Sequence, residues 1–184
     1  MNDQIMERLF FNSDKTFNSL ITICENDNPL VTVLTLHLTC ENFLEAYISA
    51  HLNIEDLFSE SPNNREDVKF RMSFEHKAKL AQRLGISKAA YNSFEILGQI
   101  RNQFAHKLLQ SEIADIHIDK LYSLINSIPN PGKELDLNDE GISYHSEEGV
   151  EQFTYKFNDS KTPKSMKLLI AFFSLIRRIT PSNH

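Results

Sequence analysis

The feature that most constrains the fold is a long apolar stretch, PLVTVLTLHLTCENFLEAYISAHL, at positions 29–52. Asn28 followed by Pro29 is typical of a helix start, because asparagine caps free backbone N–H groups and proline suits the first turn. Apolar residues lie on nearly every face of the helix that this stretch would form. Such a helix needs neighbours on several sides. The sequence therefore predicts an all-α helical bundle with residues 29–52 near its centre.

Capping and stop signals predict four more helices. A helix commonly starts after a serine or threonine. It commonly ends before a glycine, with a proline a few residues beyond. The expected ranges are 74–84 between Ser73 and Gly85, 88 to about 110 after Ser87, 115–128 before Pro129, and about 163–180 after Thr162.

A small β-hairpin insertion is expected at about 142–157. Phe153, Tyr155 and Phe157 alternate with polar residues, which is the period of a strand. A Ser-Glu-Glu-Gly turn separates them from residues 142–145. We interpret residues 1–184 as one domain, with a core at 29–128 followed by the hairpin and the C-terminal helix.

Charge is segregated along the chain, although the net charge is only −6. Residues 69–110 hold 8 basic and 2 acidic residues, and the last 24 residues hold 5 basic and no acidic ones. This distribution fits ordinary solvated helix faces. It equally fits a basic patch for a polyanion, built from residues 69–110 and the C-terminal helix.

Several classes of protein are not expected. The N-terminus, MNDQIMERLF, has acids where a secretory signal needs basic residues, and no apolar run is long enough for a membrane span. We therefore expect a cytoplasmic protein without a membrane partner. Cys24 and Cys40 have no metal-site spacing, Glu-x-x-His is absent, and no phosphate-binding glycine motif occurs. No cofactor or metal is predicted.

The stretch IRNQFAHKLL, at 100–109, places polar residues inside an otherwise apolar helix. At 100° per residue, Arg101 falls in one row with Leu97 and Phe104. Asn102 and His106 share a different, polar face. Arg101 and His106 are about 140° apart, so one helix alone does not direct both at one small ligand. A second copy packed across a two-fold axis would complete a shared site.

An arginine in an apolar row needs an anion, because an unpaired buried charge is very unfavourable. Glu41 and Glu45 lie four residues apart on the central helix and would repel each other without a cation between them. We expect Arg101 to be that cation. In a purely structural interpretation this is a core ion pair, and His106 is an ordinary core histidine.

Arg-Asn-Gln-Phe-Ala-His, within LGISKAAYNSFEILGQIRNQFAHKLL, resembles the R-x4-6-H motif of HEPN domains. The wider stretch is similar to the group around the mannitol operon repressor. The resemblance covers about residues 29–128. It implies a helical domain that acts on RNA, usually as a homodimer with both motifs in one cleft.

In HEPN ribonucleases the ribose 2′-OH attacks the adjacent phosphate without a metal. Carried over, Arg101 would stabilise charge on the phosphate, His106 would move protons, and Asn102 would orient the phosphate or the histidine. Glu41 and Glu45 would support the arginine. Many such domains are toxins of toxin–antitoxin or antiviral systems, so RNA and an antitoxin are the implied partners.

Two alternatives remain open. The mannitol operon repressor group consists of regulators, so the chain would bind a protein or DNA without catalysis. LAQRLGISKAAYNSF also has the small, turn and apolar positions of a helix-turn-helix, whose second helix would enter the major groove.

Overall fold

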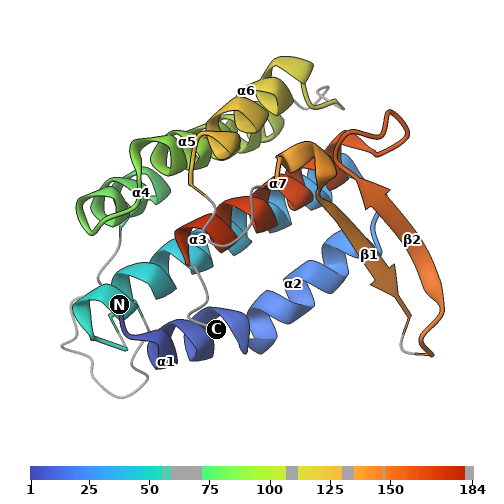
Figure 1. Cartoon of the computed structure of the whole chain (residues 1–184). Coiled ribbons are helices and arrows are strands. Elements are labelled where there is room, and N and C mark those ends of the chain that lie inside the picture. Colours follow the sequence, from blue (N-terminus) through green and yellow to red (C-terminus); the bar gives the residue numbers. More distant parts are fainter. Residues whose placement is uncertain (56, 59–71, 107–111, 130–134, 147, 181–184) are drawn as a thin grey trace.

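The computed structural model describes residues 1–55, 57–58, 72–106, 112–129, 135–146 and 148–180. Helices dominate these residues, and one two-stranded antiparallel sheet accompanies them (Figure 1). In chain order the elements are α1 Asp3–Met6, the π-helix η1 Glu7–Phe11, α2 Asp14–Cys24, α3 Pro29–Leu52, α4 Phe74–Arg83, α5 Lys88–His106, α6 Asp115–Asn126, the 3-10 helix η2 Leu137–Asp139, β1 Gly141–His145, β2 Glu151–Lys156 and α7 Lys164–Ile179. The predicted helical bundle with a hairpin is confirmed.

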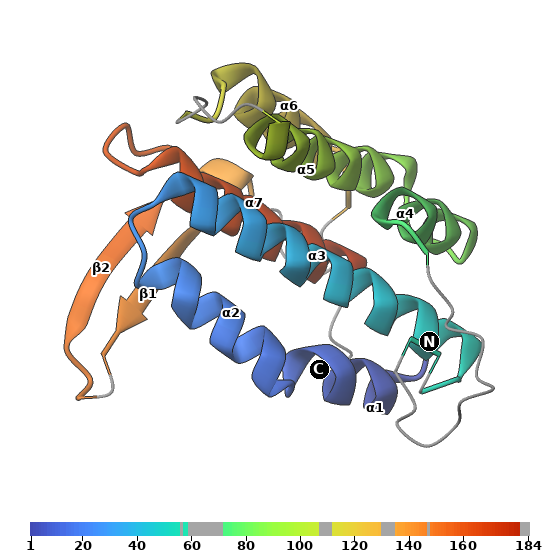
Figure 2. The same ribbon diagram turned by 180° about the vertical axis from the view of Figure 1, so that it is seen from behind.

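Helix α3 is the centre of this bundle. The side chain of Asn28 accepts a hydrogen bond from the backbone N–H of Leu30 at 2.9 Å, as the capping signal predicted. The helix ends at Leu52, where Asn53 adopts a left-handed conformation with φ of 57°. Helices α1, α2, α4, α5 and α7 all contact α3 (Figures 1 and 2).

Phe43 on α3 joins the parts of the core. Its ring is fully buried and lies 5.2 Å from Phe10 of η1, 5.9 Å from Phe94 of α5 and 6.4 Å from Phe172 of α7, measured between centroids. One hydrophobic cluster includes residues from every helix between α1 and α7. The core thus extends beyond residues 29–128, because the segment before α3 and helix α7 bury their apolar faces against α3.

The turn between α4 and α5 follows the sequence signals. Ser73 caps α4 through the backbone N–H of His76, and Ser87 accepts a hydrogen bond from the N–H of Ala90. Gly85 has a φ of 127°, a conformation that glycine adopts readily. Helix α5 is described as far as His106, and the rest of the helix expected to about 110 lies outside the described residues.

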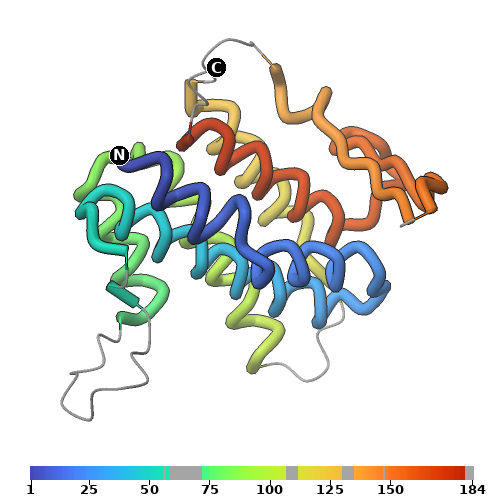
Figure 3. Tube along the Cα trace, turned by 90° about the horizontal axis from the view of Figure 1, so that it is seen from below, coloured from blue at the N-terminus to red at the C-terminus, as the bar shows by residue number. Residues whose placement is uncertain are grey.

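The hairpin lies at one end of the bundle, beside α2 (Figures 1 and 3). Ile142 pairs with Tyr155 and Tyr144 with Phe153, so the aromatic side chains share one face. The hydroxyl of Tyr144 donates to Glu25 at 2.8 Å, which ties β1 to the end of α2. The hairpin was predicted at about 142–157. In the structure its two strands and the turn between them cover residues 141–156.

The observed bounds of helices α6 and α7 agree with the predicted ranges to within two residues at each end. Helix α6 ends at Asn126 rather than at 128, before the predicted stop at Pro129. Among the described residues, no helix combines the length and apolar character that crossing a membrane would require.

The two cysteines are free and differ in burial. Cys40 is fully buried on α3, and burial raises the pKa of its thiol. Cys24, at the end of α2, is only half-buried. Because the thiolate is the reactive form, Cys40 is a poor nucleophile in the folded protein.

We expect a thiol reagent to modify Cys24 much faster than Cys40 in native buffer. Cys40 should react only as quickly as the core opens, since its sulfur has no access to solvent. Alkylation followed by peptide mass spectrometry measures both rates, with guanidinium-unfolded protein as the control. Rapid native alkylation of Cys40 would contradict the packing of α3.

Candidate active site

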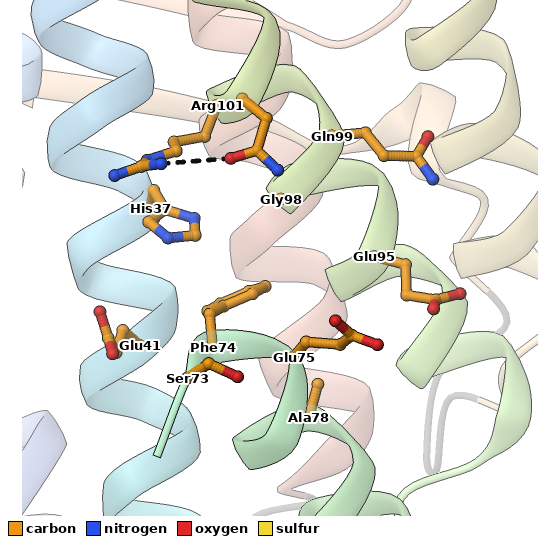
Figure 4. A pocket seen from close by; sticks show the side chains of 11 residues that line it. His37, Glu41, Ser73, Phe74, Glu75, Ala78, Glu95, Gly98, Gln99 and Arg101 are labelled. Carbon is orange, nitrogen blue, oxygen red and sulfur yellow. Dashed lines mark hydrogen bonds between the residues drawn. The ribbon is translucent and has the colours of Figure 1, made fainter. Parts of the chain in front are cut away.

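A cleft of about 500 Å³ lies between α3, α4 and α5 (Figure 4). Helix α3 contributes His37 and Glu41 to it, α4 contributes Phe74, and α5 contributes Arg101 and Asn102. Two of the three predicted catalytic residues therefore line one cleft, and the central helix forms the opposite wall.

Arg101 and Asn102 are adjacent on α5 and contact each other. Nη1 of Arg101 donates a hydrogen bond to Oδ1 of Asn102 at 3.1 Å, and the guanidinium extends towards α3 (Figure 4). Arg101 is half-buried and Asn102 is exposed. The arginine is therefore positioned by a neutral amide and remains available to a ligand in the cleft.

The prediction that Arg101 neutralises Glu41 and Glu45 is wrong. Nζ of Lys77 lies 2.5 Å from a carboxylate oxygen of each glutamate. Helix α4 packs against α3 and brings the buried Lys77 side chain between the two acids. The spacing of the glutamates correctly indicated a bridging cation, but the packing of α4 decides which cation it is.

Glu41 and Glu45 consequently have different places in the molecule. Glu41 lines the cleft, whereas Glu45 lines a second pocket with Lys15, Asn42 and Glu55. Of these two glutamates only Glu41 lines the cleft, and it is already ion-paired with Lys77.

His106 is exposed at the last residue of α5 and does not line the cleft. It lies five positions after Arg101, a rotation of about 140° on an α-helix. The expectation that one helix does not direct both residues at one ligand agrees with this arrangement. Within one chain the arginine and the histidine therefore face different surroundings.

His37, which was not among the residues predicted from the sequence, lies between Arg101 and Glu41 in the cleft (Figure 4). Its ring packs against Phe74, with centroids 4.4 Å apart and planes tilted by 44°. Its Nδ1 is buried and has no hydrogen-bond partner among the described residues. A signal existed: His37 precedes Glu41 by four positions, so both lie on one face of α3.

Burial lowers the pKa of His37, and the positive charge of Arg101 lowers it further. Glu41 acts in the opposite direction, while Lys77 again lowers the pKa. Desolvation disfavours the charged form of a histidine, and a nearby cation does the same. His37 is therefore a neutral imidazole near pH 7.

Each carboxylate of the cleft has a partner within the chain. Glu41 binds Lys77, Glu75 accepts a hydrogen bond from Lys79 at 2.5 Å, and Glu95 accepts one from the hydroxyl of Tyr91 at 2.5 Å. None of these pairs uses Arg101. The acidic residues around the cleft thus leave the guanidinium available to an anion.

The expected basic surface does not draw on the end of the C-terminal helix. Arg177 lies 2.5 Å from Glu140, and the buried Arg178 lies 3.7 Å from the same carboxylate. Lys164 pairs with Asp115 at 2.8 Å. These three cations of α7 therefore have carboxylate partners within the chain.

Helix α5 is also poorly suited to the helix-turn-helix interpretation. Ala90, Tyr91, Ser93 and Phe94 in its first turns are buried, and α5 contacts α3, α4 and α6. A recognition helix needs an exposed face for the major groove.

Comparisons with protein-family models, with curated proteins and with solved structures give no match. Within the described ranges, no group of three or more His, Cys, Asp or Glu side chains is arranged to hold a metal ion. The residues of the cleft are therefore the chemical groups that indicate a function. They provide a guanidinium, an amide and a neutral imidazole, which suit binding of a phosphate and transfer of a proton.

Proposed function

We propose that the protein is a metal-independent endoribonuclease of the toxin or antiviral type that acts as a homodimer. The observation that carries this proposal is the state of Arg101. Its side chain lines a cleft beside Asn102, and a lysine replaces it as the partner of the core glutamates. A guanidinium that has no carboxylate partner among the described residues suits a phosphodiester, which it binds through two parallel hydrogen bonds.

The chemistry follows the resemblance to HEPN ribonucleases. The 2′-oxygen of a ribose bonds to the adjacent phosphorus while the bond from phosphorus to the 5′-oxygen breaks. Arg101 stabilises the negative charge on the phosphate, and Asn102 holds the guanidinium in position. In the proposed homodimer, His106 of the partner subunit would reach the cleft that contains Arg101 and would transfer the protons there.

Purified protein should cleave RNA in the presence of EDTA. The 5′ fragments should end in a 2′,3′-cyclic phosphate, because the 2′-oxygen is the nucleophile. The assay uses single-stranded and structured RNA, with mass spectrometry of the products. A substrate with 2′-deoxyribose at the cleavage position is the matched control and should stay intact. An inactive wild-type protein, or cleavage of the deoxy substrate, would contradict the proposal.

One observation favours the alternative of a non-catalytic regulator or protein-interaction module. Leu38 is 55% exposed in the middle of α3, and Leu30 on the same helix is 40% exposed. In the regulator alternative, these two leucines would lie in a surface that another protein covers. In the ribonuclease proposal that protein is a second copy of the chain. If the wild type cleaves no RNA, the surface fits a regulatory partner or an antitoxin.

A further inference from the structure

Cleavage by a 2′-hydroxyl requires two proton transfers, and the proposed site so far assigns one histidine to them. The 2′-OH must lose a proton as its oxygen bonds to phosphorus, and the 5′-oxygen must gain one as it leaves. A single histidine can perform both only in sequence, so a second group that accepts a proton would complete the site. The cleft already contains one.

We propose that His37 is the general base of the reaction and that His106 of the partner subunit is the general acid. This inference rests on the proposed ribonuclease function. The proton of the 2′-OH passes to Nε2 of His37, while a proton from His106 passes to the 5′-oxygen. The products are a 2′,3′-cyclic phosphate and a 5′-hydroxyl, and exchange with water resets both histidines.

The position of His37 supports this role. Its side chain and the guanidinium of Arg101 enter the same cleft from facing helices, and Figure 4 shows the imidazole beside the guanidinium. A phosphate bound to Arg101 would therefore have the imidazole beside it. Because Nδ1 is shielded from solvent, we assign Nε2 as the nitrogen that meets the substrate.

The packing of His37 also limits its movement. Phe74 covers the ring from α4, with centroids 4.4 Å apart. A general base works best when its ring is held in one orientation, because a proton transfer needs hydrogen-bond geometry. Phe74 itself packs close to Gly98 of α5, where a Cβ atom would lie 3.2 Å from its ring. The three helices thus hold the imidazole in place.

The charges around His37 favour its neutral form. Arg101 on α5 and Lys77 on α4 disfavour protonation, Glu41 on α3 favours it, and burial disfavours it most strongly. Glu75 and Glu95 line the same cleft with partners of their own. A histidine of lowered pKa remains a proton acceptor at pH values where an ordinary histidine, of pKa about 6.5, is protonated.

The test measures single-turnover cleavage by His37→Gln and His37→Ala against His51→Gln. His51 is a matched control, because it lies on the same helix outside the cleft and contacts the carbonyl oxygen of Tyr47 at 3.0 Å. We expect both His37 variants to lose about 10²–10⁴-fold in rate and His51→Gln to keep the wild-type rate. Binding of RNA that carries 2′-deoxyribose at the cleavage position should not change.

The pH profile separates a general base from a structural role. The wild-type rate should fall with decreasing pH only below about 6.5, because His37 must be neutral to accept a proton. His37→Gln should lose this acidic limb. The wild-type profile needs no variant, so it tests the inference even if substitution at position 37 unfolds the protein.

Each outcome decides between the two proposals. If the wild type cleaves RNA and His37→Gln cleaves it equally fast, this inference fails and the ribonuclease function stands. Weaker binding by His37→Gln with an unchanged rate at saturating RNA also overturns it, since His37 would then only bind substrate. If the wild-type rate already falls above about pH 6.5, the inference about His37 also fails. A wild type that cleaves no RNA overturns both proposals.

Discussion

Arg101→Ala and His106→Ala should each abolish measurable RNA cleavage while the protein stays folded. Loss of a donor that stabilises developing charge lowers a rate by about 10²–10³-fold, and loss of a general acid or base lowers it by about 10²–10⁴-fold. Arg101→Lys should recover little, because lysine lacks the planar fork that binds two phosphate oxygens. Initial rates on a fluorescent RNA measure the effect.

We expect both variants to fold, because neither substitution removes a buried contact of the core. His106 is exposed, and Arg101 is half-buried with its guanidinium hydrogen-bonded to Asn102. Substitutions at such positions usually change the free energy of unfolding by no more than about 1 kcal/mol. Arg83→Ala is a matched control, since it removes an exposed arginine from α4 outside the cleft. Equal loss of activity in Arg83→Ala would indicate a general charge effect rather than a catalytic site.

Mixing the two inactive variants tests whether the site is shared between subunits. Suppose that each cleft combines Arg101 of one chain with His106 of the other. A heterodimer of Arg101→Ala and His106→Ala then has one cleft with both native residues and one cleft with neither. Random exchange of subunits should then restore about a quarter of the wild-type rate. Continued inactivity after exchange would show that Arg101 and His106 act in the same chain or not together.

Lys77→Ala should produce a large loss of stability without touching the motif on α5. Its side chain is only 6% exposed, and it is bound by Glu41 and Glu45, which are 27% and 29% exposed. Removing it leaves two like charges one helical turn apart on α3. Breaking a buried ion pair costs about 3–5 kcal/mol, and because solvent reaches both glutamates we expect about 1–3 kcal/mol here.

Denaturant unfolding followed by circular dichroism measures this loss of stability. Lys79→Ala is the matched control, because Lys79 lies on the same helix but pairs with Glu75 at the surface, with 52% and 64% of the two side chains exposed. An exposed pair of this kind contributes little to stability, so Lys79→Ala should keep nearly the wild-type midpoint. Equal midpoints for Lys77→Ala and wild type would contradict the structural importance of this cluster.

The stabilisation from Lys77 has a defined pH range. Burial acts to lower the pKa of Lys77, but the hydrogen bonds to Glu41 and Glu45 outweigh it, so the pKa is raised. A raised pKa means that the contribution is fully present below the ordinary lysine value of about 10.4. It declines as the pH rises through the raised value in the folded state. Lys77→Ala should therefore differ from wild type equally at pH 7 and pH 9.

The sequence by itself determined the boundaries of most helices and the position of the hairpin. Asn28 with Pro29, Gly85, and Thr162 with Pro163 mark ends that the structure places within a residue or two. These signals are local, because a cap or a turn involves only residues a few positions apart. The alternation of Phe153 and Tyr155 predicted strand β2 for the same reason.

Part of the candidate site was also evident from the sequence. The rotation of about 140° between Arg101 and His106 follows from helix geometry alone, and the structure places only Arg101 in the cleft. The spacing of Glu41 and Glu45 required a cation between them. Such statements concern a single helix, so they need no knowledge of how helices pack.

Only the tertiary structure decided which side chains meet across helices. Lys77 rather than Arg101 reaches the two glutamates, and His37 joins Arg101 in a cleft that no motif indicated. More than thirty residues separate each of these pairs along the chain. Their contact depends on the crossing position and rotation of α3, α4 and α5, which the shared packing of the core fixes. A periodic pattern shows which face of a helix is buried, whereas the neighbour on that face is set by the packing of the whole bundle.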